Sequence, residues 1–273
     1  MKNLSGYFNS MYFWAIVLLL LCAAASSFAI KAFPTILVIA VAACSLLDIA
    51  TKGFVLKKGF KFSASAAISG IIIGSIAPFT LSVTAIAAVL AASVVAIASK
   101  YIIKIKGRHI FNPATLGLLA SLSLFRLGDE WWAASGFNLA GFAFPVTFLL
   151  IIANYKAGKL KVSIPFLVVT SVLYAATQFI KVPFTAYGLL TFFTSLPFYF
   201  AFIMLSEPKT SPNVRREQIV FGVALAVVVF ALDSQHVRFP FFIALLAGNL
   251  AFALYRSGIF KQKQQAAVIK PAN

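Results

Sequence analysis

The stretch KGRHIFNPATLG at residues 106–117 interrupts two apolar runs and places polar residues directly before a helix start. Asn112 is typical of a helix N-cap, and Pro113 of a first helical position, where the hydrogen that proline lacks would have had no partner. A second interruption, SEPKTSPNVRRE at residues 206–217, follows about 100 residues later. Short segments broken by Gly or Pro in corresponding places are the usual indication of a site inside or near the membrane.

Composition sets the class of protein around these interruptions. Of 273 residues, 62% are apolar and only 11% are charged, whereas soluble domains have roughly 45–50% apolar and about 25% charged residues. Apolar runs of bilayer length recur along the whole chain, which predicts a single all-α, polytopic membrane domain over residues 1–273. Cys22 and Cys44 stand alone in apolar runs, so we expect neither a metal site nor a disulfide.

Hydropathy and punctuation predict ten transmembrane helices, two of them short. The third expected helix contains Gly70, Gly74 and Pro78, and the fifth begins at the Asn112 motif. The expected ranges are 11–30, 33–50, 63–79, 81–103, 112–126, 138–155, 162–181, 184–205, 217–232 and 239–255.

The basic residues test this number of helices. The net charge is +17, but 19 of the 23 Lys and Arg residues lie at the N-terminus or after even-numbered helices. The other four are Lys31, Arg126, Lys181 and Arg238. This split predicts a protein of the cell (inner) membrane with both termini on the cytoplasmic side, including a short basic tail at residues 256–273. The grouping at helix ends argues against nucleic acid as a partner, and for membrane lipids.

Ten helices divide into two sets of five, and an odd number per half requires inverted halves. We expect pseudo-repeats at roughly residues 1–130 and 131–260. Within them SIAPFTLS and LSEPKTSP end corresponding helices, and FNPATLGLL and FPFFIALLAGN begin corresponding helices on opposite sides.

The two interruptions supply the candidate site residues. The free amides of a helix start attract an anion or a polar ring, and Arg108 and His109 stand just before the first one. Ser211 and Pro212 are expected to repeat this arrangement at the start of the ninth helix. An Asn-Pro helix start needs no ligand, however, so a structural and a binding role for Asn112 remain equally open. Glu207, at the edge of the apolar phase, requires a partner and favours function.

At this point the residues resemble a known family. The run SGIIIGSIAPFTLSVTAIAAVLAASVVAIASKYIIKIKGRHIFNPATLGLL is similar to the D-type membrane protein of the Rnf electron-transport complex and to its relative, the B-type membrane protein of the sodium-pumping NADH:quinone oxidoreductase. Lys100 and Gly107 match the lysine and turn glycine of that pattern. FIMLSEPKTSPNVRREQIVFG resembles the second family signature, with Glu207 in place of its usual Asp, and FFIALLAGNLAFAL resembles the closing helix, with Asn249.

The resemblance implies ten helices in inverted halves, a bound flavin (FMN or riboflavin) and electron transfer across the membrane as one member of a complex. Family members with covalent FMN attach it to Thr in a Ser-Gly-Ala-Thr stretch. Here Ser135 and Gly136 are followed by Phe137 and Asn138. Covalent FMN is therefore doubtful, and a non-covalent flavin near the two interruptions is expected.

The sequence thus predicts a membrane subunit of a flavin-dependent electron-transfer system, rather than a complete enzyme. The candidate flavin-binding residues are Lys100, Arg108, Asn112, Thr115, Glu207, Thr210 and Ser211. No nucleotide-binding fingerprint and no cysteine set for an iron–sulfur cluster is present, so redox partner subunits must oxidise the donor. The alternative is a solute channel or transporter with inverted five-helix halves of the urea-channel kind, in which Glu207 and Asn112 would line the pore.

Overall fold

A computed structural model describes residues 11–134, 140–178, 192 and 195–258 of the chain. Nearly all of this is helical. The α-helices are α2 (Met11–Ile30), α3 (Thr35–Ala50), α4 (Ala64–Ile76), α5 (Val83–Ile102), α6 (Pro113–Leu124), α7 (Ala140–Lys156), α8 (Leu160–Gln178), α10 (Arg215–Ser234) and α11 (Pro240–Ser257). Two π-helical segments, η1 (Thr51–Val55) and η3 (Phe200–Met204), and a small hairpin of β1 (Lys104–Ile105) and β2 (Arg108–His109) complete the described elements.

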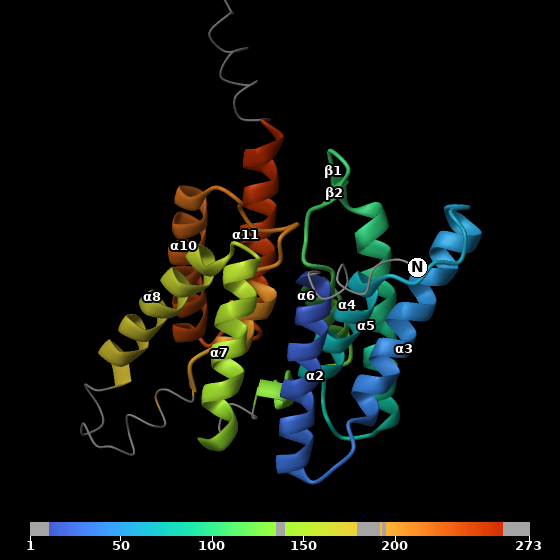
Figure 1. Cartoon of the computed structure of the whole chain (residues 1–273), viewed down its shortest axis with the longest axis horizontal. Helices are drawn as coiled ribbons and strands as arrows, with labels where there is room; N and C mark the ends of the chain where they lie inside the picture. Colours follow the sequence, from blue (N-terminus) through green and yellow to red (C-terminus); the bar gives the residue numbers. More distant parts are fainter. Residues whose placement is uncertain (1–10, 135–139, 179–191, 193–194, 259–273) are drawn as a thin grey trace, which may run out of the picture.

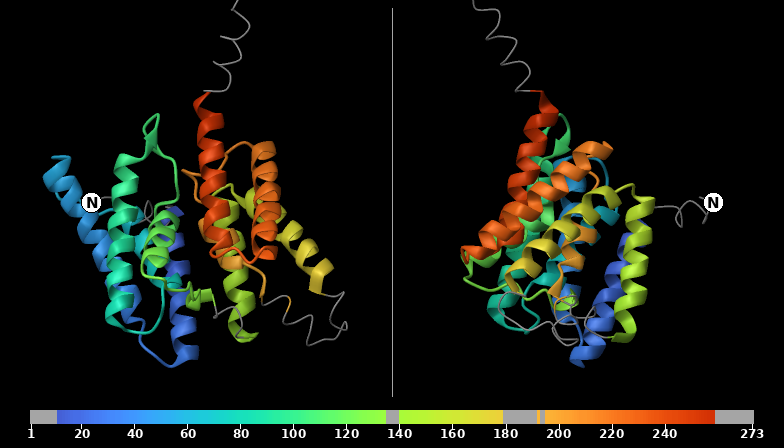
Figure 2. Two further views of the ribbon diagram at one scale, coloured as in Figure 1. Left: turned by 180° about the vertical axis from the view of Figure 1, so that it is seen from behind. Right: turned by 90° about the vertical axis from the view of Figure 1, so that its left-hand side faces the viewer.

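The helices form two groups that lie side by side (Figures 1 and 2). Helices α2–α6 make the first group, in which α3 packs on α4 and α5, and α5 packs on α6. Helices α7, α8, α10 and α11, with η3, make the second, in which α10 packs on α8 and α11. The groups meet where α2 contacts α7 and where α6 contacts α11. In the two expected halves, α2 and α7 are the first helices, and α6 and α11 are the last. Each of these contacts therefore joins a helix to its counterpart in the other half.

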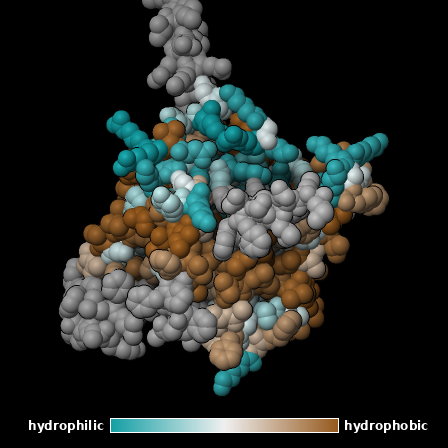
Figure 3. Space-filling model, viewed as in Figure 1, coloured by the Kyte–Doolittle hydropathy of each residue, from teal (hydrophilic) through white to brown (hydrophobic). Residues whose placement is uncertain are grey.

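Five helices of the described residues are long and apolar enough to cross a membrane: Thr35–Val55, Val83–Ile102, Leu160–Thr177, Arg215–Ser234 and Pro240–Ser257. On the face shown in Figure 3, apolar residues form a broad band, and hydrophilic residues gather at the end that carries β1 and β2. A broad apolar outer surface cannot be covered by water without cost, so the architecture agrees with the expected all-α membrane class.

Helices α4 and α6 are too short to cross a bilayer. They have 13 and 12 residues, which is about 20 Å and about 18 Å of helix against a hydrocarbon core of about 30 Å. The segment after α6 folds under the end of α4, where Trp132 Nε1 donates to the Gly74 carbonyl at 2.7 Å and the Glu130 amide donates to the Ile76 carbonyl at 2.9 Å. The chain itself therefore satisfies carbonyls at the end of α4, as burial requires.

Glycines allow the short helices α4 and α6 to pack closely against their long neighbours α3 and α5. A Cβ at Gly70 would lie 2.6 Å from the Val41 Cα of α3, and one at Gly74 would lie 2.4 Å from the Leu37 Cα. Gly117 of α6 approaches the Ala92 carbonyl of α5 in the same way. Small residues four apart are the usual means by which membrane helices approach closely.

The expected helix ranges agree with the structure to within a few residues wherever the chain is described. The second expected helix is longer than predicted, because η1 continues α3 to Val55. Most of the eighth expected range, 184–205, lies outside the described residues, apart from η3 and its neighbours. The N-terminal ten residues and most of the basic tail also lie outside them.

Candidate functional site

Asn112 begins α6, as the sequence predicts. Its Oδ1 accepts a hydrogen bond from the Thr115 amide at 3.1 Å, and Pro113 occupies the first helical position. The Asn112 backbone is extended, which is the usual N-cap conformation. The predicted helix cap is therefore confirmed.

A second asparagine joins this helix start to the other group of helices. Asn249 of α11 accepts a hydrogen bond from the Asn112 amide through its Oδ1 at 3.0 Å. Its Nδ2 donates to the Thr210 carbonyl at 3.1 Å. Asn112 in turn points its Nδ2 at the Met204 carbonyl, 3.4 Å away. All these residues are buried, so the two interruptions of the chain are joined directly inside the protein.

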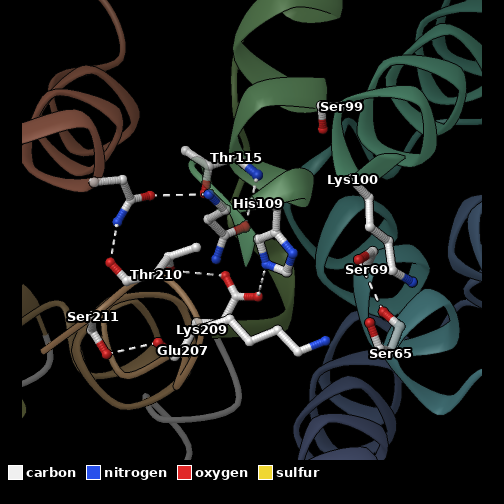
Figure 4. A network of polar contacts seen from close by, with 12 residues as sticks. Ser65, Ser69, Ser99, Lys100, His109, Thr115, Glu207, Lys209, Thr210 and Ser211 are labelled. Carbon is white, nitrogen blue, oxygen red and sulfur yellow. Dashed lines mark hydrogen bonds and ion pairs between the residues drawn. The ribbon is translucent and has the colours of Figure 1, made fainter. Parts of the chain in front are cut away.

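Glu207, in the second interruption, lies at the centre of a network of polar contacts (Figure 4). Its Oε1 is 3.2 Å from His109 Nε2, and its Oε2 accepts from the Thr210 hydroxyl at 3.0 Å. The Ser211 hydroxyl donates to the Glu207 carbonyl at 2.7 Å. The expectation that a carboxylate here needs partners is met, and His109 from the first interruption supplies one of them.

Side chains of the second group satisfy carbonyls of η3 and of the broken segment that follows it. Asn154 of α7 donates to the Phe202 carbonyl at 2.8 Å, and Ser163 of α8 donates to the Ala201 carbonyl at 2.7 Å. The buried Lys159 ammonium donates to the Ser211 and Pro212 carbonyls at 3.3 and 2.7 Å.

Lys159 has further partners but no carboxylate within ion-pair distance among the described residues. It also donates to Asn213 Oδ1 at 2.8 Å, and Gln218 Nε2 donates to the Gly158 and Pro212 carbonyls. Burial lowers the pKa of the Lys159 ammonium to about 8, and the Glu207 carboxylate only partly opposes this effect. Burying the charged Lys159 ammonium thus costs free energy, and its hydrogen bonds hold the broken segment in place.

A cavity of about 110 Å³ lies where the two groups meet. Its polar side is made by Ser65 and Ser69 of α4, Asn112, Asn154 and the turn that carries Glu207. The remaining wall is apolar and comes from both groups: Ala15, Leu18, Leu19, Ile68, Ile72, Pro113, Leu150, Ala153, Ala157, Phe202 and Ile203. The cavity therefore combines an apolar slot with one hydrogen-bonding edge.

Of the seven predicted site residues, Asn112 and Glu207 line the cavity. Thr115 is bonded to Asn112, and Thr210 and Ser211 are bonded to Glu207. Lys100 and Arg108 lie outside its wall. Lys100 is buried and pairs with Asp48 at 3.0 Å, and Asp48 also accepts from Tyr101 at 2.7 Å and pairs with Lys52 at 2.6 Å. Arg108 is exposed on β2. Strands β1 and β2 pair Ile105 with Arg108, and this hairpin carries Arg108 away from the Asn112 helix start.

The expected helix start at Ser211 and Pro212 is wrong. Helix α10 begins at Arg215 after Val214, which makes no side-chain cap. Ser211 turns back to the Glu207 carbonyl instead, and the carbonyls of this segment are bonded by Lys159 and Asn249 as well as by Gln218 of α10. The stretch from Ser135 to Asn138, which bears on the attachment of covalent FMN, lies outside the described residues.

Thr115, the last of the candidate residues, is fully buried in the first turn of α6. Its hydroxyl has no hydrogen-bond partner among the described residues. Sequence reasoning did not find the site contributions of Asn154, Lys159 and Ser163, which are ordinary polar residues in or beside apolar runs. The sequence offered one signal for them: a polar residue in an apolar run needs a partner inside the protein.

Compared with known proteins, the chain matches no protein-family model and no curated sequence.

Proposed function

We propose that this chain is the membrane subunit of a flavin-dependent transmembrane electron-transfer system. The observation that carries the proposal is the cavity between the two groups of helices, where the start of α6 and the Glu207 turn meet. These are the two segments on which the resemblance to the Rnf and sodium-pumping oxidoreductase proteins rests. Their meeting in space, although about 100 residues separate them, is what a shared ligand site requires.

The cavity suits the head of a flavin in chemical character. An isoalloxazine ring has an apolar face and one edge of carbonyl and N–H groups, and the cavity offers apolar walls and one polar edge. Ser69, Asn112 and Asn154 would bind that edge, while Leu18, Ile72 and Phe202 would pack on the ring and exclude water. A flavin held without a covalent bond would supply the electron-accepting chemistry, and the protein its position and polarity.

The remaining features of the proposal follow from charge and contacts. Hydrophilic residues gather at the end that carries the hairpin (Figure 3), and the expected positive-inside orientation makes this end cytoplasmic in a cell membrane. The contacts of α2 with α7 and of α6 with α11 support two inverted halves of five helices. Electrons would enter from redox partner subunits, flavoprotein or iron–sulfur, because the chain carries no motif for a soluble donor.

A second function also fits the cavity. Two short helices that end at a central polar site are a feature of transporters. Under this alternative, Glu207 and Asn112 would bind a small neutral solute on its path. The two functions differ in whether the native protein holds a coloured cofactor.

The test is the visible absorption spectrum and flavin content of the protein, purified in mild detergent after co-expression with any neighbouring redox subunits. We expect flavin bands that disappear from the protein fraction on denaturation. Ala153→Leu fills the cavity with a larger side chain and should weaken flavin binding by about five- to a hundredfold, because overpacking and lost contacts cost roughly 1–3 kcal/mol.

Ala231→Leu is the matched control, since Ala231 is an exposed alanine of α10 that does not line the cavity. It should keep the flavin content of the natural chain. A colourless natural chain that conducts a small neutral solute in liposomes would contradict electron transfer and favour the channel. Flavin that stays on the denatured polypeptide would show that the attachment is covalent.

A further inference from the structure

A basic cleft lies next to the cavity, at the end of the molecule that carries the hairpin. It has a volume of about 460 Å³ and is lined by Lys100, Tyr101, Lys104, Gly107, Arg108, His109, Pro208, Lys209 and Asn213. These residues come from the end of α5, from the hairpin and from the loop after Glu207. We propose that this cleft binds a phosphate group, and that Lys104, Arg108 and Lys209 provide its charge.

The first argument is that the positive charge of the cleft is not neutralised by the protein. The carboxylates near it are already engaged, because Asp48 is shared by Lys100 and Lys52, and Glu207 binds His109 and Thr210. No ion pair is formed by Lys104, Arg108 or Lys209 among the described residues. Three cations without a carboxylate therefore surround one hollow, which concentrates a positive potential there.

The second argument is convergence from separate segments. Basic residues placed only to orient the chain in the membrane need no common target, and Lys57, Lys58 and Lys161 are exposed residues outside this cleft. The cleft cations instead come from elements that are distant in sequence. In Figure 4, Lys209 extends from its loop toward the side on which Lys100 and the α4 serines lie.

The turn of the hairpin contributes to this convergence. Lys106 and Gly107 both have positive φ angles, 49° and 77°, which is the backbone geometry of a tight two-residue hairpin turn. The turn reverses the chain so that Lys104 pairs with His109 and Ile105 with Arg108. It thereby places Lys104 opposite His109, and both line the cleft together with Arg108, while Lys106 at the tip does not line it.

The chemistry of these side chains suits a phosphate group. The planar Arg108 guanidinium can bind two phosphate oxygens at once, and the two ammonium groups add point charges from other directions. A phosphate dianion has enough oxygens to meet all three. Pro208 and Lys209 line both the cleft and the cavity, so a ligand with a ring in the cavity can place a phosphate in the cleft.

Two sources of phosphate fit this chemistry: the terminal phosphate of FMN and the headgroup of an anionic lipid. The site itself does not depend on the proposed function, because binding of inorganic phosphate can be measured with no flavin present. The probes are therefore inorganic phosphate, FMN compared with riboflavin, and nanodiscs of phosphatidylglycerol compared with phosphatidylcholine.

The experiment measures equilibrium binding of labelled inorganic phosphate to the full chain in uncharged detergent at constant ionic strength. We expect saturable binding that weakens by about a hundredfold or more in Arg108→Gln/Lys209→Gln, since each of the two removed charged hydrogen bonds is worth roughly ten- to a hundredfold. Lys106→Gln is the matched control and should bind as the natural chain does. Absence of saturable binding, or equal binding by the double variant, would overturn the proposal.

The other probes identify the source once phosphate binding is established. FMN binding at least about tenfold tighter than riboflavin, with the difference lost in the double variant, would assign the cleft to the flavin phosphate. Retention of phosphatidylglycerol over phosphatidylcholine, lost in the same variant, would assign it to lipid. Equal and tight binding of both flavins would uphold the proposed function while removing FMN as the source, so the two proposals fail separately.

Discussion

At the scale of single residues, two asparagines hold the candidate site together. Asn112 caps its own helix and, through its backbone amide, is bound by Asn249. Asn249 also binds the Thr210 carbonyl in the other interruption of the chain. In an apolar interior each of these groups would otherwise lack a partner, so Asn249 acts as a bridge between two segments that the sequence separates widely.

This bridge can be tested with Asn249→Leu, a replacement of similar size. It leaves the Asn112 amide and the Thr210 carbonyl buried without partners, and each such loss costs about 1–3 kcal/mol. We expect thermal unfolding in detergent to shift to clearly lower temperature. Gln235→Leu is the control, because Gln235 is exposed after α10 and its side chain makes no hydrogen bond in the described structure. Equal shifts in the two variants would contradict the bridging role.

The local part of this arrangement was predictable and the distant part was not. The cap at Asn112 follows from residues that are neighbours in the chain, as helix caps do. Glu207 and Asp48 each have a partner close in sequence, Thr210 and Lys52. Their ion-pair partners His109 and Lys100, however, are far away in sequence. The sequence alone predicts that a buried carboxylate needs a partner. Which residue is that partner depends on how the helices pack.

At the scale of elements, the segment between η3 and α10 is held by its neighbours. It has no regular hydrogen-bonding pattern of its own, and its carbonyls are satisfied by Lys159, Gln218 and Asn249 from three different places. The prediction of a helix start at Ser211 failed for this reason. A serine before a proline can cap a helix or close a turn, and here the surrounding donors favour the turn.

The pH dependence of stability tests the part played by Lys159. Its folded-state pKa is lowered to about 8, whereas an unfolded lysine has a value of about 10.4. Between these values the unfolded chain binds more protons, so the free energy of unfolding should rise as pH increases from about 8 to about 10. Below pH 8 the burial cost is fully present. Lys159→Met cannot titrate there and supplies the baseline.

The measurement is the apparent unfolding temperature of both proteins from pH 7 to pH 10. Over the upper half of this range, we expect the unfolding temperature of the natural chain to rise relative to that of Lys159→Met. The rise should correspond to a gain in the free energy of unfolding on the order of 1–3 kcal/mol at most. A difference that is constant with pH would show that Lys159 titrates normally.

Helix packing in the second group gives another prediction. A Cβ at Gly222 of α10 would lie 2.3 Å from the Val162 carbonyl of α8, whereas one at Gly128 would meet nothing within 4 Å. Gly222→Ala should therefore destabilise the protein by about 1–3 kcal/mol through overpacking, despite the better helix propensity of alanine. Gly128→Ala should leave the unfolding temperature almost unchanged. An unchanged Gly222→Ala protein would mean that α8 and α10 lie further apart.

At the scale of the whole molecule, the two groups of helices lie side by side (Figure 1), and the cavity with its polar edge lies between them. The face shown in Figure 3 carries a broad apolar band. The class and most helix ranges were predictable, because hydropathy and bilayer thickness constrain them directly. The cavity and the cleft were not, because each takes side chains from several segments. The structure also separates two residues that the sequence pattern places at one site, with Asn112 in the cavity and Arg108 in the cleft.

The orientation of the molecule in the membrane gives the last prediction. Cys22 and Cys44 are both buried and free, so single cysteines can be introduced without removing them. Lys57→Cys and Lys106→Cys lie at the basic end, and Lys31→Cys and Arg126→Cys replace two of the four basic residues expected on the other side. Because cytoplasmic loops retain basic residues, a maleimide that cannot cross membranes should label only the last two in intact cells. All four should react after the cells are permeabilised, which shows that each thiol is accessible. Labelling of Lys57→Cys or Lys106→Cys in intact cells would reverse the orientation and place both the cleft and the mouth of the cavity outside, where cytoplasmic redox partners cannot reach them.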